Sequence, residues 1–539
     1  MNETRTDGST AGLSGTFDPR MWQKDMRSSV AVPALTILFH PDVRRVGDWT
    51  ALSEILLGRE ALVSRSHPEL TSPDRQAGGP LADRYISRQP IRFQPGPDKG
   101  IVLSPGESRT RVEIDGEPVL QSREIAAAEL ERGVVLELAG RVVLLLHWIF
   151  QSPPEPAGRL GLIGESARLA QVRWDVRRVA DLDVPVMLRG ETGTGKELVA
   201  RAIHDASPRR SGPFIAINLG AIPSTLVASE LFGAVKGAFT GSVQSQDGYF
   251  RRAQGGTLFL DEVGEAPPEV QVMLLRALET REINPVGSQG PVRVDARVLA
   301  ATDADLEARV QAGEFRAPLL HRLSGFEIWL PPLRERREDV GRLLVHFLRQ
   351  ELAATGETQR LAAESWLPAR LVARLARYHW PGNVRQLRNL VRQIVIGSRG
   401  LPDLAIGPAV ERLLQSNASP AGLEDSGSRP ADVPAMPGPP APPARDRRKP
   451  ADISQDELIA ALRAHRWDLQ ATAAHLHISR PSLYALIESS PNVRKAGDLS
   501  PEEIARCWEE CEGDLDAMVG RLEVSRKALA RRLRELKLV

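Results

Sequence analysis

The chain has few cysteines and almost no net charge. Its 539 residues include only two cysteines, Cys507 and Cys511, which lie four positions apart with no cluster of other metal ligands around them. This usage excludes a disulfide framework, argues against a zinc site and indicates a reducing compartment. The formal net charge is +1, so any affinity for nucleic acid must come from a local basic patch.

The sequence also lacks the apolar segments that carry a chain into or across a membrane. It has no run of about 18 apolar residues, which is the length that spans a bilayer, and its first 20 residues contain no apolar signal core. A cytoplasmic protein is therefore expected. The length of 539 residues exceeds what one core supports and suggests three or four domains.

Residues 190–197 read Gly-Glu-Thr-Gly-Thr-Gly-Lys-Glu, between an apolar run at 184–188 and a helical pattern at 198–203. Strand, glycine-rich turn and helix form a phosphate-binding loop, because backbone N–H groups and the helix N-terminus attract phosphate. Glu197 replaces the usual Ser or Thr ligand of Mg²⁺. Coordination of the ion is therefore expected from downstream carboxylates and water. The residues predicted to bind ATP in this loop are Gly190, Glu191, Thr192, Gly193, Thr194, Gly195, Lys196 and Glu197.

A second motif, Gly-Gly-Thr-Leu-Phe-Leu-Asp-Glu at 255–262, reads as a buried strand that ends in two carboxylates. Asp261 is predicted to hold Mg²⁺ through water, and Glu262 to polarise the attacking water. Both are assigned as catalytic residues. The alternative is a strand capped by solvated acids, which the upstream phosphate loop makes the weaker interpretation.

Strands alternate with helices from residue 162 to about 398, which predicts a parallel α/β core followed by a helical part after Pro332. Several landmarks in this region resemble the AAA+ domain of sigma-54-dependent transcription activators. They are the segments 230–233 (Glu-Leu-Phe-Gly), 236–242 (Lys-Gly-Ala-Phe-Thr-Gly-Ser), 298–303 (Val-Leu-Ala-Ala-Thr-Asp), 313–316 (Gly-Glu-Phe-Arg), 321–323 (His-Arg-Leu), 330–336 (Leu-Pro-Pro-Leu-Arg-Glu-Arg) and 380–387 (Trp-Pro-Gly-Asn-Val-Arg-Gln-Leu).

The resemblance implies roles for individual residues. Asp303 and Arg385 would be sensors at the nucleotide, and Arg316 and Arg322 would be arginine fingers that reach the neighbouring subunit's site in a homo-oligomeric ring, expected to be a hexamer. An exposed aromatic in a glycine-flanked loop is costly unless it meets a partner, which favours a sigma-factor contact at Gly237, Ala238, Phe239, Thr240, Gly241 and Ser242. Ser242 replaces the family's alanine, and Asp303 its asparagine.

Short β-type runs separated by turns extend from residue 33 to about 148 and predict a β-sandwich. The order of Leu-Gly-Arg at 57–59, Ile-Ser-Arg at 86–88 and Asp115-Gly116 resembles a forkhead-associated (FHA) domain. That resemblance implies phosphothreonine recognition through Arg59, Ser87 and Arg88, although Pro90 and Thr110 replace the family's histidine and asparagine. The alternative is a packing or dimer module.

The C-terminal part contains an internal repeat with an offset of 46 residues, and each copy resembles a Fis-type helix-turn-helix. The predicted DNA-binding residues are Arg480, Ser482, Tyr484, Arg526, Lys527 and Arg531. Residues 521–539 carry seven Lys or Arg against two Glu, a local excess that suits phosphate contacts. The second copy serves either DNA binding or dimerisation.

These patterns predict a multidomain protein. Its parts are a disordered lead (1–30), an FHA-like β-sandwich (31–150), a linker (151–160), an α/β ATPase subdomain (161–332), a helical subdomain (333–415), a proline-rich linker (416–452) and two helix-turn-helix units (453–495 and 496–539). The expected function is an ATP- and Mg²⁺-dependent activator that binds promoter-upstream DNA and remodels sigma-54 RNA polymerase under phosphothreonine control. The main alternative is a DNA-binding regulator whose AAA+ module only switches oligomeric state, and a general ATP-driven unfoldase is a third.

Overall fold

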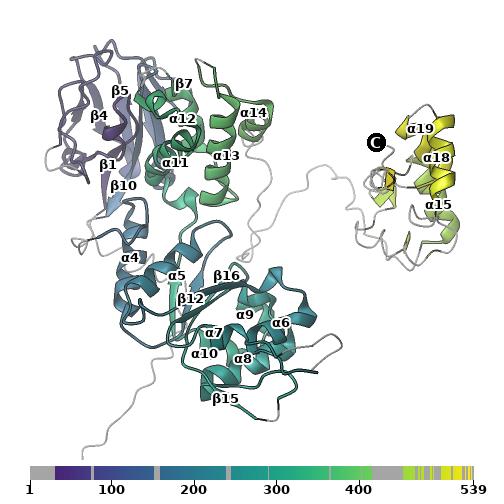
Figure 1. The fold of residues 1–539 in the computed structure, drawn as a ribbon. Coiled ribbons are helices and arrows are strands. Elements are labelled where there is room, and N and C mark those ends of the chain that lie inside the picture. The colour runs from purple at the N-terminus through teal and green to yellow at the C-terminus, as the bar shows by residue number, and fades with distance from the viewer. Residues whose placement is uncertain are drawn as a thin grey trace, which may run out of the picture. The chain divides into compact units, whose positions relative to one another are not determined.

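The computed structural model describes residues 31–74, 78–150, 158–237, 245–288, 290–362, 366–401, 403–415 and much of 453–536. The predicted lead and the whole of the predicted proline-rich linker, 416–452, lie outside these residues. The chain forms two compact units, Met1–Leu423 and Glu424–Val539 (Figure 1). Within the described ranges, no helix combines the length and the apolar character needed to cross a bilayer.

Residues 31–150, the β-domain, contain two antiparallel sheets with the strand orders β2-β1-β10-β9-β6-β7 and β3-β4-β5-β8. Period-2 alternation explains them: in β4 the side chains of Ile91 and Phe93 are buried, whereas those of Arg92 and Gln94 are exposed. The elements are β1 (Ala31–Phe39), η2 (Val43–Arg45), β2 (Trp49–Ala51), α2 (Ser53–Leu56), β3 (Ala61–Val63), β4 (Ile91–Pro95), η3 (Pro97–Lys99), β5 (Ile101–Ser104), β6 (Val112–Ile114), β7 (Glu117–Pro118), β8 (Arg123–Ile125), α3 (Ala127–Arg132), β9 (Val134–Leu138) and β10 (Val142–Phe150).

The predicted hairpin turn at Asp115-Gly116 joins β6 to β7, and both residues have positive φ, 52° and 93°. Two central residues with positive φ match the right-handed twist of the flanking strands. The prediction of a β-rich N-terminal domain is confirmed. Its FHA-like character stays a prediction.

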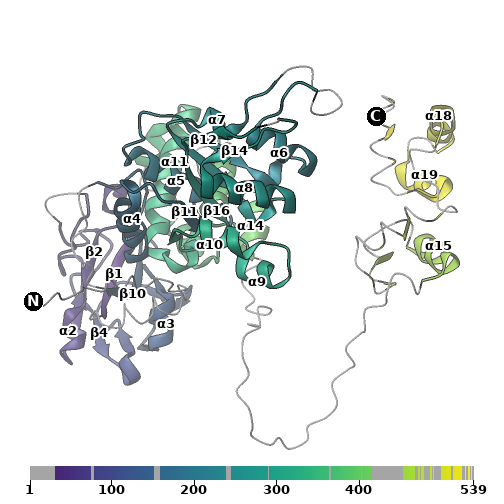
Figure 2. The same ribbon diagram turned by 90° about the horizontal axis from the view of Figure 1, so that it is seen from below.

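The α/β domain, residues 161–332, has a parallel five-stranded sheet in the order β12-β13-β16-β11-β17. One apolar core packs α4 and α5 on the sheet and another packs α6, α8 and α10 on it (Figure 2). The elements are α4 (Ala167–Ala180), β11 (Val186–Arg189), α5 (Lys196–Asp205), β12 (Phe214–Asn218), η4 (Leu219–Ala221), α6 (Ser224–Phe232), α7 (Tyr249–Arg252), β13 (Thr257–Asp261), η5 (Val263–Glu265), α8 (Pro268–Thr280), β14 (Glu282–Ile283), β15 (Val292–Arg293), β16 (Arg297–Thr302), α9 (Leu306–Gln311), α10 (Ala317–Leu323) and β17 (Phe326–Trp329). The predicted α/β core is confirmed.

The helical subdomain, residues 333–415, follows Pro332 as predicted. Its elements are η6 (Leu333–Glu335), η7 (Arg337–Asp339), α11 (Val340–Thr355), η8 (Thr358–Ala362), α12 (Ala369–Arg377), α13 (Asn383–Gly397) and α14 (Pro408–Gln415). Trp380 is fully buried, and its indole N–H donates to the Leu375 carbonyl at 3.0 Å, which ties the segment before α13 to α12.

The β-domain and the helical subdomain share one apolar core. Leu38 and Phe39 of β1 and Leu145 of β10 belong to the same buried cluster as Leu344 of α11 and Val372 of α12. Figure 1 shows α11 and α12 alongside the sheet that contains β1 and β10. The β-domain therefore has a core of its own, around Leu35, Ile91 and Ile101, and also contributes residues to the core of the helical subdomain.

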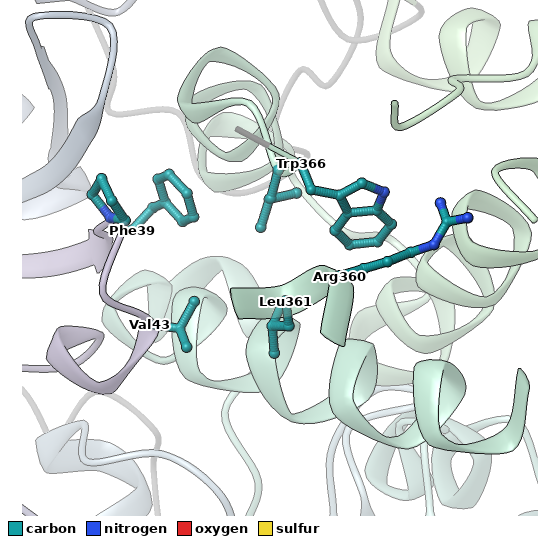
Figure 3. A pocket seen from close by; sticks show the side chains of 7 residues that line it. Phe39, Val43, Arg360, Leu361 and Trp366 are labelled. Carbon is teal, nitrogen blue, oxygen red and sulfur yellow. The ribbon is translucent and has the colours of Figure 1, made fainter. Parts of the chain in front are cut away.

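Figure 3 shows one part of this shared core, where Phe39 and Val43 face Leu361 and Trp366. The hollow between them has a volume of about 10 Å³, which is room for at most one water molecule. The contact is therefore close-packed, as in the interior of a single domain.

The C-terminal unit contains α15 (Gln455–Ala464), α18 (Pro501–Glu510) and α19 (Leu515–Leu522). Its buried apolar residues run from Ile453 to Leu533 and form a single cluster. The predicted all-α character of this region is confirmed for the residues that the structure describes.

Candidate functional site

The glycine-rich loop joins the end of β11 to the start of α5. Gly190, Gly193 and Gly195 have φ values of 150°, 77° and 109°, a region that glycine adopts without the steric cost of a Cβ. A Cβ on Gly193 would also lie 2.4 Å from the carbonyl oxygen of Gly382 in the helical subdomain. The glycines therefore serve both the turn and the close approach of the second subdomain.

The helical subdomain holds this loop through side chains. Arg334 donates two hydrogen bonds to the Glu191 carboxylate, at 2.8 and 2.6 Å. Asn383 donates to Glu191 Oε2 at 3.0 Å and to the Thr192 carbonyl at 3.1 Å, and accepts from the Leu333 N–H at 2.8 Å. The hydrogen bonds from Arg334 hold the pKa of Glu191 below its usual value, so this loop carboxylate stays ionised.

Arg385 lies on the same side of the loop. Its backbone N–H donates to the Gly193 carbonyl at 3.3 Å, and its guanidinium donates to Thr192 Oγ1 at 3.3 Å. Arg336 donates to the Thr194 carbonyl at 3.1 Å. Residues 330–336 and 380–387 thus meet at the phosphate loop, although they are far apart in the sequence.

Lys196 is the buried cation at the centre of the site. Its ammonium group donates to the carbonyls of Gly190 at 2.7 Å and Glu191 at 3.3 Å. Burial lowers its pKa, an effect that the charges of Asp303, Asp261 and Glu262 oppose and that of Arg385 reinforces. The structure therefore brings together the predicted lysine, the two carboxylates at the end of β13 and the two residues predicted to be sensors.

The carboxylates come from neighbouring strand ends. Asp261 ends β13 and Asp303 follows β16, the strand between β13 and β11, so the carboxyl ends of three parallel strands meet beside the loop. Burial raises the pKa of Asp261 although Lys196 opposes this, and the charge of Glu197 adds to the rise. A desolvated carboxyl group of this kind favours a bound cation.

Glu262 adopts a left-handed backbone conformation, with φ 54° and ψ 46°. A non-glycine residue in this region is uncommon and often marks a functional position. A Cβ on Gly220 would lie 2.3 Å from Glu262 Oε2, so the absence of a side chain at 220 leaves room for this carboxylate. The register pairs Asn218 with Asp261 beside it.

Arg316 and Arg322 lie apart from the loop of their own chain. Arg316 is exposed at the N-cap of α10, and its backbone N–H donates to the buried Gln271 side chain at 2.9 Å. Arg322 is exposed on α10, and its guanidinium donates to the Leu278 carbonyl at 3.2 and 3.1 Å. Within the described residues, neither side chain contacts the phosphate loop.

The predicted sigma-contact loop is described only at its base. Gly237 is exposed, whereas Ala238, Phe239, Thr240, Gly241 and Ser242 lie outside the described residues. Ala234 pairs with Gln246 across the base and with Val286, and the Lys236 N–H donates to Ser245 Oγ at 3.2 Å. These contacts hold the two ends of the loop together on the α/β domain.

In the β-domain, the backbone N–H of Ser87 donates to Thr110 Oγ1 at 2.8 Å. Ser87, a predicted phosphopeptide contact, is therefore a direct neighbour of Thr110, the residue that replaces the asparagine of FHA domains. Arg59 and Arg88 are exposed. Among the described residues, no ion pair neutralises either arginine and no polar contact joins Arg59 to Ser87. Arg480, Ser482, Tyr484, Arg526, Lys527 and Arg531 lie outside the described residues.

Sequence reasoning missed several residues that shape the nucleotide site. Arg334 and Asn383 stand inside motifs already noted, but their contact with Glu191 spans 143 and 192 residues of chain. The usable signal was the charge of Glu191: a carboxylate in a loop built to bind phosphate needs a cation to neutralise it. Nothing in the local pattern pointed to Gly220 or Asn218.

Comparison with known families agrees with this arrangement. Residues 162–329 match the sigma-54 interaction domain, residues 334–404 the AAA+ ATPase lid domain, and residues 449–486 the Fis family of bacterial regulatory proteins.

Curated relatives cover the same central region. The transcriptional regulator NtrC of Azospirillum brasilense is 50% identical over 236 residues, which is 44% of this chain and 48% of the relative. A Nif-specific regulatory protein of Rhodobacter capsulatus is 40% identical over 371 residues, 64% of this chain and 63% of the relative. The chain thus spans about half the length of the NtrC relatives that it matches.

Among solved structures, NtrX from Brucella abortus in complex with ADP is 31% identical, with 61% of this chain and 69% of that chain covered and a TM-score of 0.42. The family matches alone show that the chain carries a sigma-54 interaction domain with its AAA+ ATPase lid, followed by a segment of the Fis family of bacterial regulatory proteins.

Proposed function

We propose that this chain is an ATP-hydrolysing transcription activator of the bacterial cytoplasm that remodels sigma-54 RNA polymerase at promoters. The observation that carries the proposal is the convergence of Lys196, Asp261, Glu262, Asp303 and Arg385 on one loop in a domain of the sigma-54 interaction family. Lys196 binds the β- and γ-phosphates of ATP in place of the loop carbonyls that it contacts in the structure.

The donor set fits a magnesium ion. Asp261 is a carboxyl group whose burial raises its pKa, and Glu197 lies close enough for its charge to add to that rise. A partly buried carboxylate with a second, exposed one close by suits Mg²⁺, which keeps several waters and takes one or two carboxylates. The ion would neutralise phosphate charge. Glu262 orients and deprotonates the attacking water.

The arginines on α10 support a ring. Arg316 and Arg322 are exposed and have no contact with their own loop among the described residues, so they can stabilise transition-state charge only in a neighbouring subunit. Assembly into a homo-oligomeric ring, of six subunits by analogy with the family, completes each site. Phe239 and Thr240, in the sequence between the paired Ala234 and Gln246, contact the sigma factor, while the C-terminal unit holds the ring on DNA upstream of the promoter.

The decisive experiment measures open-complex formation by sigma-54 polymerase with the full chain, with and without ATP. Wild type should require ATP, and Phe239→Ala should keep ATPase activity within about twofold while open complexes are lost. Leu226→Ala, an exposed apolar residue on α6, is the matched control and should behave like wild type. If wild type hydrolyses ATP without forming open complexes and Ser242→Ala restores them, the natural chain only switches oligomeric state.

For the β-domain we propose recognition of a phosphothreonine peptide, with Arg59 contacting the phosphate, Ser87 donating its hydroxyl and Arg88 steering the peptide. Arg59 and Arg88 are exposed and have no ion pair among the described residues, and the Ser87 backbone is held by Thr110; these observations support this proposal. The β-domain shares an apolar core with the helical subdomain, which gives a bound peptide a direct route to the ATPase. A peptide that binds one conformational state of the chain more tightly than another shifts the population towards that state.

Calorimetry of the full chain with a phosphothreonine peptide library tests this input. Wild type should bind, Arg59→Ala should lose at least tenfold in affinity, and unphosphorylated peptides should not bind. Arg132→Ala, an exposed arginine on α3, removes the same charge and should bind normally. Equal affinity of wild type and Arg59→Ala would leave the β-domain as a packing module.

A further inference from the structure

A cleft of about 470 Å³ lies between the β-domain and the start of α12. Its volume is within the range of small-molecule sites, roughly 300–1,000 Å³. Charged side chains from both parts line it, namely Arg109, Arg111, Glu113, Glu137 and Arg370. The proposed phosphopeptide contacts Arg59, Ser87 and Arg88 are not among its lining residues. This hollow, the β–α12 cleft, is therefore separate from the sites described above.

Glu137 stands on the face of β9 that points away from the core of the β-domain. Its two neighbours, Leu136 and Leu138, belong to that core, whereas Val135 belongs to the core of the helical subdomain. Because side chains alternate along a strand, Glu137 shares the face of Val135. The register places it directly opposite Glu113 of β6. A pair of glutamates thus occupies the sheet face that packs against the helical subdomain.

The carboxyl group of Glu137 has no partner. The residue is 8% exposed, and among the described residues its side chain forms no hydrogen bond and no ion pair. Burial raises its pKa, and the charge of Glu113 adds to the rise. Glu113 itself pairs with Arg111 at 2.7 Å. A buried polar group without a partner costs stability, as do like charges opposite each other on neighbouring strands. Such a group in a cleft marks a candidate ligand site.

Two arginines line the same cleft without carboxylates of their own. Arg109 precedes β6, and Arg370 lies in the first turn of α12. Both are exposed, and neither forms an ion pair within the part of the chain that the structure describes. The charge of Arg370 also lowers the pKa of Glu137, against the effect of burial, so the two groups are within electrostatic range. The β–α12 cleft therefore offers one unmatched anion and two unmatched cations.

We propose that the β–α12 cleft binds a small zwitterion of the amino-acid type. Its ammonium group donates to the Glu137 carboxylate, and its acid group accepts charge-assisted hydrogen bonds from Arg109 and Arg370. A ligand with an acid group alone would leave Glu137 buried and unpaired, which costs affinity. Because Glu137 belongs to the β-domain and Arg370 to the helical subdomain, the bound zwitterion joins the two parts.

Calorimetry of the full chain tests the proposal with each L-amino acid and with phosphoethanolamine, which carries a phosphate in place of the carboxylate. At least one of these zwitterions should bind with a Kd below about 1 mM. The corresponding acid without the amino group, and the corresponding amine without the acid group, should each bind at least about tenfold more weakly. Binding of phosphoethanolamine alone would support the site with phosphate as the acid group.

Glu137→Gln and Arg370→Ala should each lower the affinity at least about tenfold. Glu131→Gln on α3 and Arg388→Ala on α13 remove the same charges from exposed positions and should bind like wild type. Glu137→Gln keeps the shape of the side chain and removes a buried charge without a partner. The unliganded variant should therefore unfold at a urea midpoint equal to or above that of wild type, whereas loss of a purely structural glutamate would lower it.

Two results would overturn the proposal. One is the absence of binding by wild type to every zwitterion in the panel. The other is equal affinity for the acid that lacks the amino group, together with unchanged binding by Glu137→Gln, which would leave an anion site only. Wild-type affinity in Arg370→Ala would contradict a site shared with the helical subdomain. None of these results bears on ATP hydrolysis or on phosphopeptide binding, because the residues proposed for those functions do not line the cleft.

Discussion

Lys196→Ala is expected to abolish ATP binding, whereas Glu262→Gln should bind ATP and fail to hydrolyse it. The lysine is the buried cation on which the charges of Asp261, Asp303 and Glu262 act. Without it these carboxylates face the phosphates with one opposing cation fewer, and like charges at short range in a partly desolvated site repel strongly. Binding of a fluorescent ATP analogue should fall below detection at micromolar protein.

Glutamine at position 262 keeps the shape of the side chain and removes its basicity. A positioned general base contributes roughly 10²- to 10⁴-fold to a rate, so ATPase turnover should fall by at least about a hundredfold while nucleotide affinity changes little. The left-handed backbone at 262 is as acceptable to glutamine as to glutamate. Loss of turnover therefore reports lost chemistry and not a rearranged turn.

A matched control lies three residues away. Glu265, in η5, is exposed and forms an ion pair with Arg309 at 2.7 Å on the surface. Glu265→Gln removes the same charge from the same turn and should keep wild-type ATPase activity. Equal rates for wild type and Glu262→Gln would remove Glu262 from its catalytic role, and unaltered ATP affinity in Lys196→Ala would remove the phosphate-loop assignment.

Gly341→Ala is expected to separate the β-domain from the helical subdomain. Gly341 lies in the first turn of α11, where an added Cβ would be 2.2 Å from the Leu38 carbonyl oxygen and 2.9 Å from its carbon atoms. Both partners are backbone, in a strand and a helix, so the contact can be relieved only by moving one element. Overpacking of this kind costs about 1–3 kcal/mol, and the flanking Val340 and Leu344 lose part of the shared core as well.

The expected result is a lower urea midpoint for the full chain and faster hydrogen exchange of the β1 amides. Because the helical subdomain also carries Asn383 and Arg385 to the phosphate loop, its displacement should raise the KM for ATP. Gly397→Ala is the control: this helical glycine ends α13, and its nearest neighbour would be 3.9 Å from the new Cβ. It should be neutral, or stabilising by up to about 1 kcal/mol.

If Gly341→Ala unfolds like wild type and β1 exchanges no faster, the two parts do not share a core in solution. If exchange increases while KM stays constant, the shared core exists but does not reach the nucleotide site. Both substitutions add one methyl group to a helix of the same subdomain. A difference between them therefore measures the effect of the close approach between α11 and β1.

Local patterns in the sequence determined the phosphate loop, the two carboxylates at the end of β13, the alternation of strands and helices, the turn at Asp115-Gly116 and the C-terminal repeat. Each depends on neighbouring residues: glycine spacing sets the loop, apolar periodicity sets strands and helices, and two left-handed residues set a hairpin. Such patterns can be recognised without knowledge of the rest of the chain. They also placed Lys196, Asp261 and Glu262 in one site, because the carboxyl ends of parallel strands meet at one edge of a sheet.

Only the tertiary structure decided how these parts combine. The hydrogen bonds from Arg334 and Asn383 to Glu191 span 143 and 192 residues, and no periodicity encodes a partner at that separation. The same holds for the core that joins β1 to α11 and for the cluster that fuses the two C-terminal copies. A buried apolar residue looks the same in sequence whichever surface covers it, since burial of apolar area is not directional. Which surfaces meet is decided by the shapes that the folded elements present to one another.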